Sequence, residues 1–336
     1  MKHSLLVAIA AATFATQALA HHGVAGVGAA AIEGPGAPVE SASSAVLPQG
    51  RGLAYLKLDH AKFKSVDPTD TQADYSQYWM IGAGYGFTPW FSAYVFLPYN
   101  RKIDTSEPPG ASSARFDTTG WADVSVMGQI GFKYDSGQGW QLTPANESLD
   151  DLEDWHFSVF AGATAPTGDP DRRDRNGTID PGKSTGFGKP SLSLGLTVSK
   201  MLTRDLTFSL EASALRFREN TYADASTMRF GSEDRLNAAL SYRMFGDPGR
   251  KLRVDGVLEV QHLELGKDHQ NGIDDPDTGG RILYLMPGLR IFKDNMSFAL
   301  GYKKPVSTRL NEATAKQQGA EGTEKYRVIF SASWLF

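Results

Sequence analysis

Several alternating segments of this 336-residue chain carry charged residues on their polar face, an arrangement that can orient solutes in a polar lumen. Successive side chains of a strand point to opposite faces, so the pattern sets a charged face against an apolar face. If the charged face surrounds water, its mixed signs would select and orient solutes, as rings of charge do in pores. If the charges pair with one another, they would instead fill a small barrel as a polar core. The candidate pore-lining residues are Lys57, Asp59, Asp123, Glu211, Arg243, Arg253, Asp255, Glu259, Arg290 and Lys303, and the same face carries Lys133, Arg235, Lys325 and Arg327.

Two Asp-rich segments have some of the oxygen ligands of a calcium loop. Asp174 and Asp180 lie on either side of an Asn-Gly pair that begins at Asn176. Residues 271–276 have a similar order, an Asn-Gly pair followed by Asp residues. Calcium prefers clustered carboxylate and carbonyl oxygens, but no bidentate Glu follows either segment. Since Asn-Gly also makes a good β-turn unaided, a loop turn is favoured over a metal site.

Histidines offer the other candidate metal and catalytic groups. His21 and His22 would begin the mature chain and could chelate copper or zinc, although two adjacent His give only part of a ligand shell. An incidental pair on a tail is the alternative. His156 lies in EDWHFSVF, which lacks the His-to-Ser motif of the outer-membrane phospholipase. No Gly-x-Ser-x-Gly or His-Glu-x-x-His motif is present either, so we expect no enzymatic activity and no cofactor.

Composition narrows the possible partners. The chain has no Cys, which excludes disulfides and thiolate metal sites. Its net charge is −4, from 34 basic and 38 acidic residues, so nucleic acid is not an expected partner. The mean hydropathy of −0.32 is compatible with a transmembrane β-barrel, whose strands alternate apolar and polar residues.

The N-terminus has the features of a signal peptide. Residues 1–3 are basic, residues 5–12 are apolar, and Ala18-Leu19-Ala20 predicts cleavage before His21. Beyond residue 20 no segment reaches the run of about 18 apolar residues that a membrane helix needs, so any insertion must use strands. We expect a signal peptide at 1–20, an extended lead segment at 21–49 and a barrel at 50–336.

Twelve alternating segments predict an all-β protein. Their lengths, about 9 to 14 residues, exceed those of ordinary soluble strands and suit tilted strands that cross a bilayer. The predicted strands are 51–63, 74–87, 90–100, 121–134, 155–165, 188–201, 205–217, 233–245, 251–265, 280–292, 296–304 and 324–336.

Short and long connections alternate between these segments, as in outer-membrane barrels with short periplasmic turns and long external loops. Residues 135–154 are the exception, a long connection on the short-turn side. We therefore predict a single closed, twelve-stranded antiparallel barrel in the outer membrane of a Gram-negative bacterium. A secreted β-sandwich is the alternative.

The last predicted strand has the form of an outer-membrane assembly signal. Alternate residues are apolar, and the chain ends on an aromatic residue. We expect the barrel-assembly machinery and outer-membrane lipid as partners. The signal residues are Tyr326, Val328, Phe330, Trp334 and Phe336.

The lead segment 21–49 is rich in Gly, Ala, Ser and Pro and has no strand period. One interpretation is that it enters the barrel from the periplasmic end and restricts the pore. The other is a flexible periplasmic tail without contacts.

Four stretches resemble a known family: residues 34–52 (GPGAPVESASSAVLPQGRG), 85–102 (YGFTPWFSAYVFLPYNRK), 120–134 (GWADVSVMGQIGFKY) and 184–200 (STGFGKPSLSLGLTVSK). They are similar to the transporter-like outer-membrane family named for the meta-cleavage pathway of phenol degradation. The resemblance runs from about Gly34 to Phe336. It implies a barrel that passes small, often aromatic or hydrophobic, compounds.

The leading functional hypothesis is an outer-membrane channel that passes such small-molecule solutes by passive diffusion. A structural or adhesive barrel, which binds a surface partner or cation through its external loops, is the alternative. An outer-membrane hydrolase ranks last.

Overall fold

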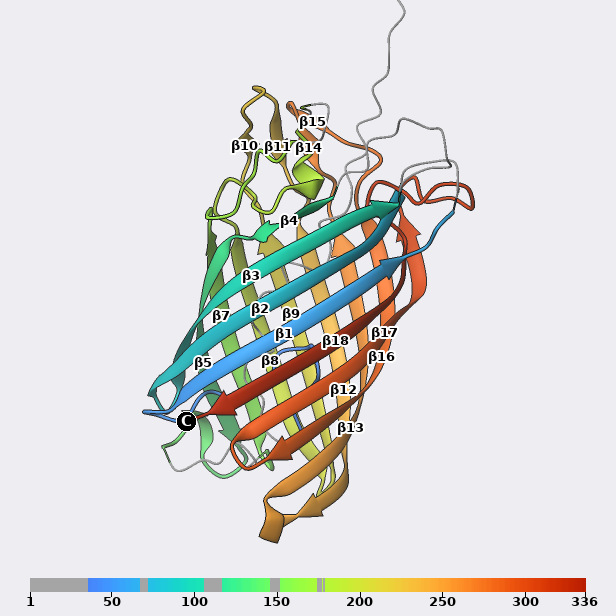
Figure 1. The fold of residues 1–336 in the computed structure, drawn as a ribbon. Coiled ribbons are helices and arrows are strands. Elements are labelled where there is room, and N and C mark those ends of the chain that lie inside the picture. The colour runs from blue at the N-terminus through green and yellow to red at the C-terminus, as the bar shows by residue number, and fades with distance from the viewer. Residues whose placement is uncertain (1–35, 67–71, 106–116, 146–151, 174–176, 178) are drawn as a thin grey trace, which may run out of the picture.

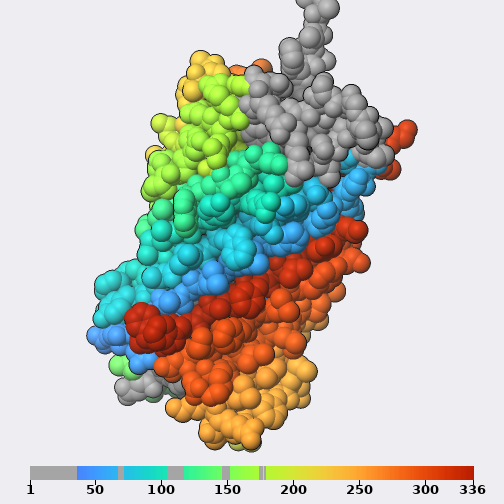
Figure 2. Space-filling view, viewed as in Figure 1, coloured from blue at the N-terminus to red at the C-terminus, as the bar shows by residue number. Residues whose placement is uncertain are grey.

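Twelve long antiparallel strands form the wall of a closed barrel (Figure 1). The computed structural model describes residues 36–66, 72–105, 117–145, 152–173, 177 and 179–336. The barrel closes where β1 pairs with β18, from Leu53 opposite Leu335 to Phe63 opposite Glu324. Figure 2 shows these first and last strands, blue and red, side by side on the outer face. The predicted twelve-stranded barrel is therefore confirmed. The wall strands are β1 (Gly52–Phe63), β2 (Gln72–Thr88), β3 (Phe91–Thr105), β5 (Val124–Asp135), β7 (Trp155–Ala165), β8 (Leu192–Thr203), β9 (Leu206–Arg216), β12 (Glu233–Asp247), β13 (Leu252–Leu265), β16 (Gly280–Lys293), β17 (Met296–Leu310) and β18 (Glu324–Leu335).

Alternation along each strand separates a buried inner face from an exposed apolar outer face. On β18, Arg327, Ile329 and Ser331 are buried inside the barrel, whereas Trp334 is exposed outside. Outward residues such as Leu194 and Leu300 are 58% and 52% exposed. An exposed apolar belt is what a barrel wall in contact with lipid requires.

Three strand ends differ from the sequence prediction by four residues or more. β3 continues to Thr105 and β17 to Leu310, past the points where apolar alternation stops. Strand pairing can continue there because the ladder needs backbone groups and not an apolar outer face. β8 begins at Leu192 rather than at residue 188, since Pro190 has no N–H for the ladder.

The two ends of the barrel carry different connections. Tight turns join β2 to β3, β8 to β9 and β16 to β17, and the short 3-10 helix η3 (Pro248–Arg250) joins β12 to β13. The long connection after β5 contains β6 (Gly139–Leu142), which folds back to pair with β5. Among the described residues, no helix is long and apolar enough to span a bilayer.

The long loops at the other end form a cap above the strands (Figure 1). Its elements are β4 (Thr118–Trp121), η2 (Pro181–Lys183), β10 (Asn220–Thr221), β11 (Thr227–Arg229), β14 (His269–Gln270) and β15 (Ile273–Asp274). Strands β10, β11, β14 and β15 make a small separate sheet. Beneath it Ile179, Tyr222, Met228 and Phe230 are buried together. The external loops thus have an apolar core of their own.

Candidate functional site in the barrel lumen

Residues 36–49 of the lead segment lie inside the barrel. The Gly36 N–H donates to Asp255, near the start of β13, and the Leu47 N–H donates to Ser92 near the start of β3. Both strand starts are at the short-turn end. Between these points the segment reaches Glu211 and Gln129, which lie midway along β9 and β5. The described segment is therefore a loop that rises from the short-turn end to the middle of the barrel and returns.

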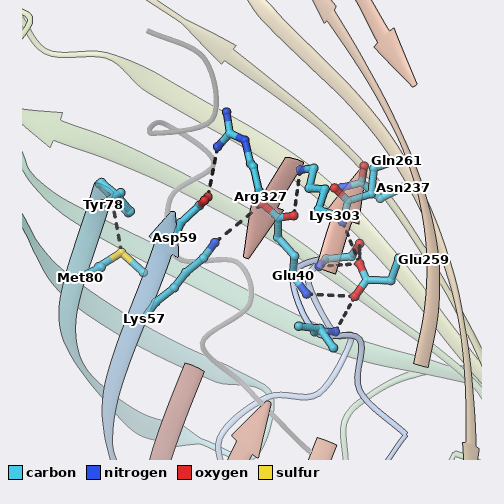
Figure 3. Close-up of polar contacts among 12 residues, drawn as sticks. Glu40, Lys57, Asp59, Tyr78, Met80, Asn237, Glu259, Gln261, Lys303 and Arg327 are labelled. Atoms are coloured by element: carbon cyan, nitrogen blue, oxygen red, sulfur yellow. Dashed lines mark hydrogen bonds and ion pairs between the residues drawn. The ribbon is translucent and has the colours of Figure 1, made fainter. Parts of the chain in front are cut away.

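Glu259 on β13 holds the deepest part of this loop (Figure 3). Its carboxylate accepts the N–H groups of Val39 at 2.5 Å, Glu40 at 3.0 Å and Ser41 at 3.1 Å, and the Ser41 hydroxyl at 2.5 Å. Gln261 also donates to it at 2.9 Å. Hydrogen bonds to an ionised acceptor are stronger than neutral ones, so this buried carboxylate is the main anchor of the segment.

Further polar contacts continue along the segment. Glu211 accepts the Ala42 N–H at 2.7 Å, and Gln129 donates to the Ser43 carbonyl at 3.1 Å. Arg290, which is fully buried, donates to the Pro38 carbonyl. Since an irregular segment has no strand partners, these side chains supply the hydrogen bonds that its buried backbone needs.

Glycines in the wall leave room for the segment. A Cβ at Gly86 would lie 2.2 Å from the Pro48 carbonyl oxygen, and one at Gly131 would lie 2.1 Å from a Val46 methyl carbon. Neither distance is tolerated by real side chains. Atoms of the segment therefore pack directly against the backbone of the wall at these two glycines.

Glu40 is the one acidic side chain that the described segment brings into the lumen. Its carboxylate lies 2.8 Å from the Lys303 ammonium and 3.8 Å from that of Lys57 (Figure 3). Both lysines are almost completely buried, at 3% and 5% exposed. Their neighbour Arg327 is paired with Asp59 at 3.1 Å and with Glu324.

Part of the lumen wall is apolar and rich in aromatic rings. Its inward side chains come from β1, β2, β3, β5 and β7, and Ala42 and Leu47 of the segment pack against them. They are Leu53, Tyr55, Tyr78, Met80, Tyr94, Phe96, Met127 and Phe160. The segment therefore contacts both this aromatic cluster and charged side chains of the wall.

The sequence profile of one family, described as "Putative MetA-pathway of phenol degradation", matches residues 69–313. The chain belongs to this family. No curated protein matches this chain.

Solved structures similar to this family member are outer-membrane barrels. The COG4313 outer membrane channel from Pseudomonas putida F1 has a TM-score of 0.65 and 15% identity, over 88% of this chain and 98% of that one. The β domain of the Bordetella autotransporter BrkA has a TM-score of 0.44 and 11% identity, over 85% of this chain and 100% of that one. The CymD monoaromatic hydrocarbon channel has a TM-score of 0.38 and 9% identity, over 86% and 88%. The first of these similarities supports the same fold.

Most candidate pore-lining residues of this family member are buried inside the barrel wall. The exposed fraction is at most 5% for Lys57, Asp59, Glu211, Asp255, Glu259, Arg290 and Lys303. Arg253 is partly buried and donates to Asp255 at 2.6 Å. The charges are thus brought together largely as pairs and as ligands of the segment, which the alternation alone did not reveal.

Two candidates have other positions. Arg243 is at the short-turn rim, 3.6 Å from Asp205, next to a β-bulge. Asp123 lies between β4 and β5 and accepts the N–H groups of Gly168 and Phe187, both at 2.8 Å. Burial raises the pKa of Asp123 above its ordinary value, although these N–H donors lower it. Asp123 therefore anchors the external loops.

Of the candidate metal ligands, Asp180 alone lies in the described part of the chain. There, no group of three or more His, Cys, Asp or Glu side chains is placed to hold a metal ion. The Asp180 carboxylate instead caps η2 by accepting the Gly182 N–H at 2.9 Å. His21, His22, Asp174 and Asn176 lie outside the described residues.

The residues of the predicted assembly signal all face outward. Trp334 and Phe336 are about half exposed, and their rings lie 5.0 Å apart between centroids. Tyr326 stacks on Tyr302 of β17 at 5.7 Å. Val328 and Phe330 are partly exposed on the same face.

Sequence reasoning missed Glu40, Glu233 and Glu324 as lumen residues. Glu233 and Glu324 begin β12 and β18, and are paired with Arg235 and Arg327. Glu233 falls on the inward period of β12, so the alternation could have found it. Glu324 does not fall on the inward period of β18, because a register shift between Lys62 and Phe63 of the paired strand turns it inward and leaves Lys325 exposed. Glu40 lies in a segment with no period, and only the tertiary structure reveals its contacts.

Proposed function

We propose that this protein is an outer-membrane channel through which small hydrophobic or aromatic solutes diffuse passively, and that residues 36–49 restrict its lumen. On this proposal the chain is exported by a cleaved signal peptide and inserted by the barrel-assembly machinery. It has no catalytic role.

The aromatic cluster of the lumen is the observation that carries the proposal. Tyr55, Tyr94 and Phe96 are buried and form edge and stacked ring contacts at centroid distances of 6.1 to 6.4 Å. Ala42 and Leu47 of the segment pack against this aromatic cluster. When the segment moves aside, the aromatic rings and the hydrogen-bonding groups of the lumen can receive a small aromatic solute. The family description, which names a phenol degradation pathway, supports the same solute class.

The test uses a reversible link between segment and wall. Because the natural chain has no Cys, Ser43→Cys with Gln129→Cys introduces just two thiols at positions that are already in contact. A bifunctional thiol reagent with a cleavable spacer joins them. The readouts are uptake of the apolar fluorophore N-phenyl-1-naphthylamine by a porin-deficient Gram-negative host and single-channel conductance.

We expect both readouts to fall on linking and to recover on cleavage of the spacer in the same protein. Uptake that equals that of the empty host in every state would contradict the channel. Uptake that is unaffected by the link would contradict restriction by the segment.

The folded cap favours one second function. Its buried cluster around Tyr222 and Phe230 shows that the external loops have a defined structure, as a surface that binds a partner needs. A barrel that binds cells or matrix but neither conducts nor takes up the fluorophore would support the adhesive alternative.

A further inference from the structure

The ion pairs of Glu40 show what must happen when the segment leaves. Lys57 and Lys303 are almost fully buried, and among the described residues Glu40 is the carboxylate paired with both. Withdrawing Glu40 would leave both ammonium groups in the lumen without this partner. Removing one partner of an ion pair costs free energy, which the anion of a solute can recover by taking its place.

The surroundings of the two lysines indicate what that anion carries. The Lys303 ammonium lies 4.3 Å from the centroid of the Tyr284 ring. Tyr284 belongs to an inward apolar cluster with Leu263, Ile282 and Leu310. The position of Glu40 is therefore a cationic point beside an apolar surface, which suits a carboxylate attached to an apolar or aromatic body.

The neighbouring charges do not offer the same site. Arg327 is paired with Asp59 and Glu324, and Arg235 is paired with Glu233. An incoming carboxylate at either arginine would compete with acidic groups of the wall itself. At Lys57 and Lys303 it competes with Glu40, which is attached to a segment that can move.

We propose that Lys57 and Lys303 form a lumenal binding site for small aromatic carboxylates, and that Glu40 is its tethered occupant. An aromatic carboxylate exchanges with the Glu40 carboxylate, and residues 36–49 lose one of their anchors as it binds. This inference rests on the proposed function and narrows its solute class to compounds with an anionic group.

The test compares two probes that share a ring and differ in charge. Binding of 4-fluorobenzoate and of neutral 4-fluorobenzyl alcohol to the folded, detergent-solubilised full chain is followed by 19F NMR. Glu40→Gln removes the competing carboxylate and leaves both lysines. Lys303→Gln removes a cation, and Lys304→Gln, whose side chain is exposed on the other face of β17, is the matched control.

We expect Glu40→Gln to bind 4-fluorobenzoate at least tenfold more tightly than the natural chain. We expect Lys303→Gln, in the Glu40→Gln background, to reverse this gain, and Lys304→Gln to leave it. The alcohol should bind equally to all variants. Equal binding of acid and alcohol, or a gain that survives Lys303→Gln, would overturn the proposal.

A second measurement covers a variant that fails to fold. In the natural sequence carrying only Ser44→Cys, 4-fluorobenzoate should speed thiol modification at the segment and the alcohol should not. An absence of any difference would again overturn the site. Carboxylate binding without fluorophore uptake would overturn the proposed channel function alone, whereas uptake without carboxylate binding would overturn this inference alone.

Discussion

Replacing Glu259 by Gln should release residues 36–49 from the lumen while the barrel stays intact. The Glu259 carboxylate accepts four hydrogen bonds from residues 39 to 41. Glutamine keeps one acceptor oxygen. Its amide NH2 takes the place of the second oxygen and faces N–H or O–H donors, from which it cannot accept a hydrogen bond. Glu259 is fully buried, so water does not compensate for the lost acceptor.

The expected size of the effect follows from these contacts. A hydrogen bond to a charged group contributes about 1.5 to 3 kcal/mol. The loss of two therefore lowers the free energy that holds the segment in the lumen by at least about 3 kcal/mol. Each 1.4 kcal/mol corresponds to roughly a factor of ten in an equilibrium constant. The displaced population should therefore rise about 100-fold.

Thiol accessibility measures that population directly. Ser44 is 3% exposed, and the chain contains no Cys, so Ser44→Cys gives a single reporter in the segment. The rate of maleimide labelling should rise about 100-fold when Glu259→Gln is added. Glu264→Gln on the same strand, whose side chain is exposed, is the matched control and should leave the rate unchanged. Unchanged labelling in a Glu259→Gln barrel with normal heat-modifiable migration would refute the reasoning.

Three further predictions concern other parts of the molecule. Deleting residues 37–46 should raise single-channel conductance, because it removes the loop that occupies the lumen and keeps the 47–51 contacts to the wall; unchanged conductance would show that the segment does not limit the pore. Deleting Phe336 should lower the folded outer-membrane pool without affecting export, since its ring faces outward and contacts Trp334 and not the lumen, and insertion at full yield would exclude an assembly role. Asp123→Asn should destabilise the cap by about 1 to 3 kcal/mol, because one of the Gly168 and Phe187 N–H groups loses its acceptor; loop proteolysis should speed up while the barrel stays heat-modifiable, and equal proteolysis would contradict the anchoring role.

The barrel wall was predictable because its signal is local. The alternation within β9 or β13 fixes both the strand and its inward face without any knowledge of neighbours. Strand ends were less predictable where pairing outlasts the apolar pattern, as in β3 and β17. The late start of β8 could have been predicted from Pro190, which has no N–H for the ladder.

The pairing of lumen charges was not predictable, because it depends on register around the whole barrel. Lys303 and Glu40 are 263 positions apart, and no spacing in the sequence relates them. The alternation also placed Arg243 in the lumen with the others, whereas its place at the end of β12 pairs it with Asp205 of the adjacent turn. For the lead segment, composition indicated a flexible chain and could not distinguish a lumenal loop from a tail.

The sequence separation of the segment's anchors has a consequence for the order of assembly. Gly36 and Asp255 are 219 positions apart, and Val39 and Glu259 are 220 apart. The chain that carries the anchors is therefore synthesised long after the segment, and long-range contacts of this kind form late. Once β1 has paired with β18, the sheet has no free edge. A segment that is still outside must then enter the barrel through one of its open ends. Refolding in detergent should then have two kinetic phases, closure of the barrel and then entry of the segment into the lumen. The second phase should vanish when residues 37–46 are deleted and slow down when they are tethered outside.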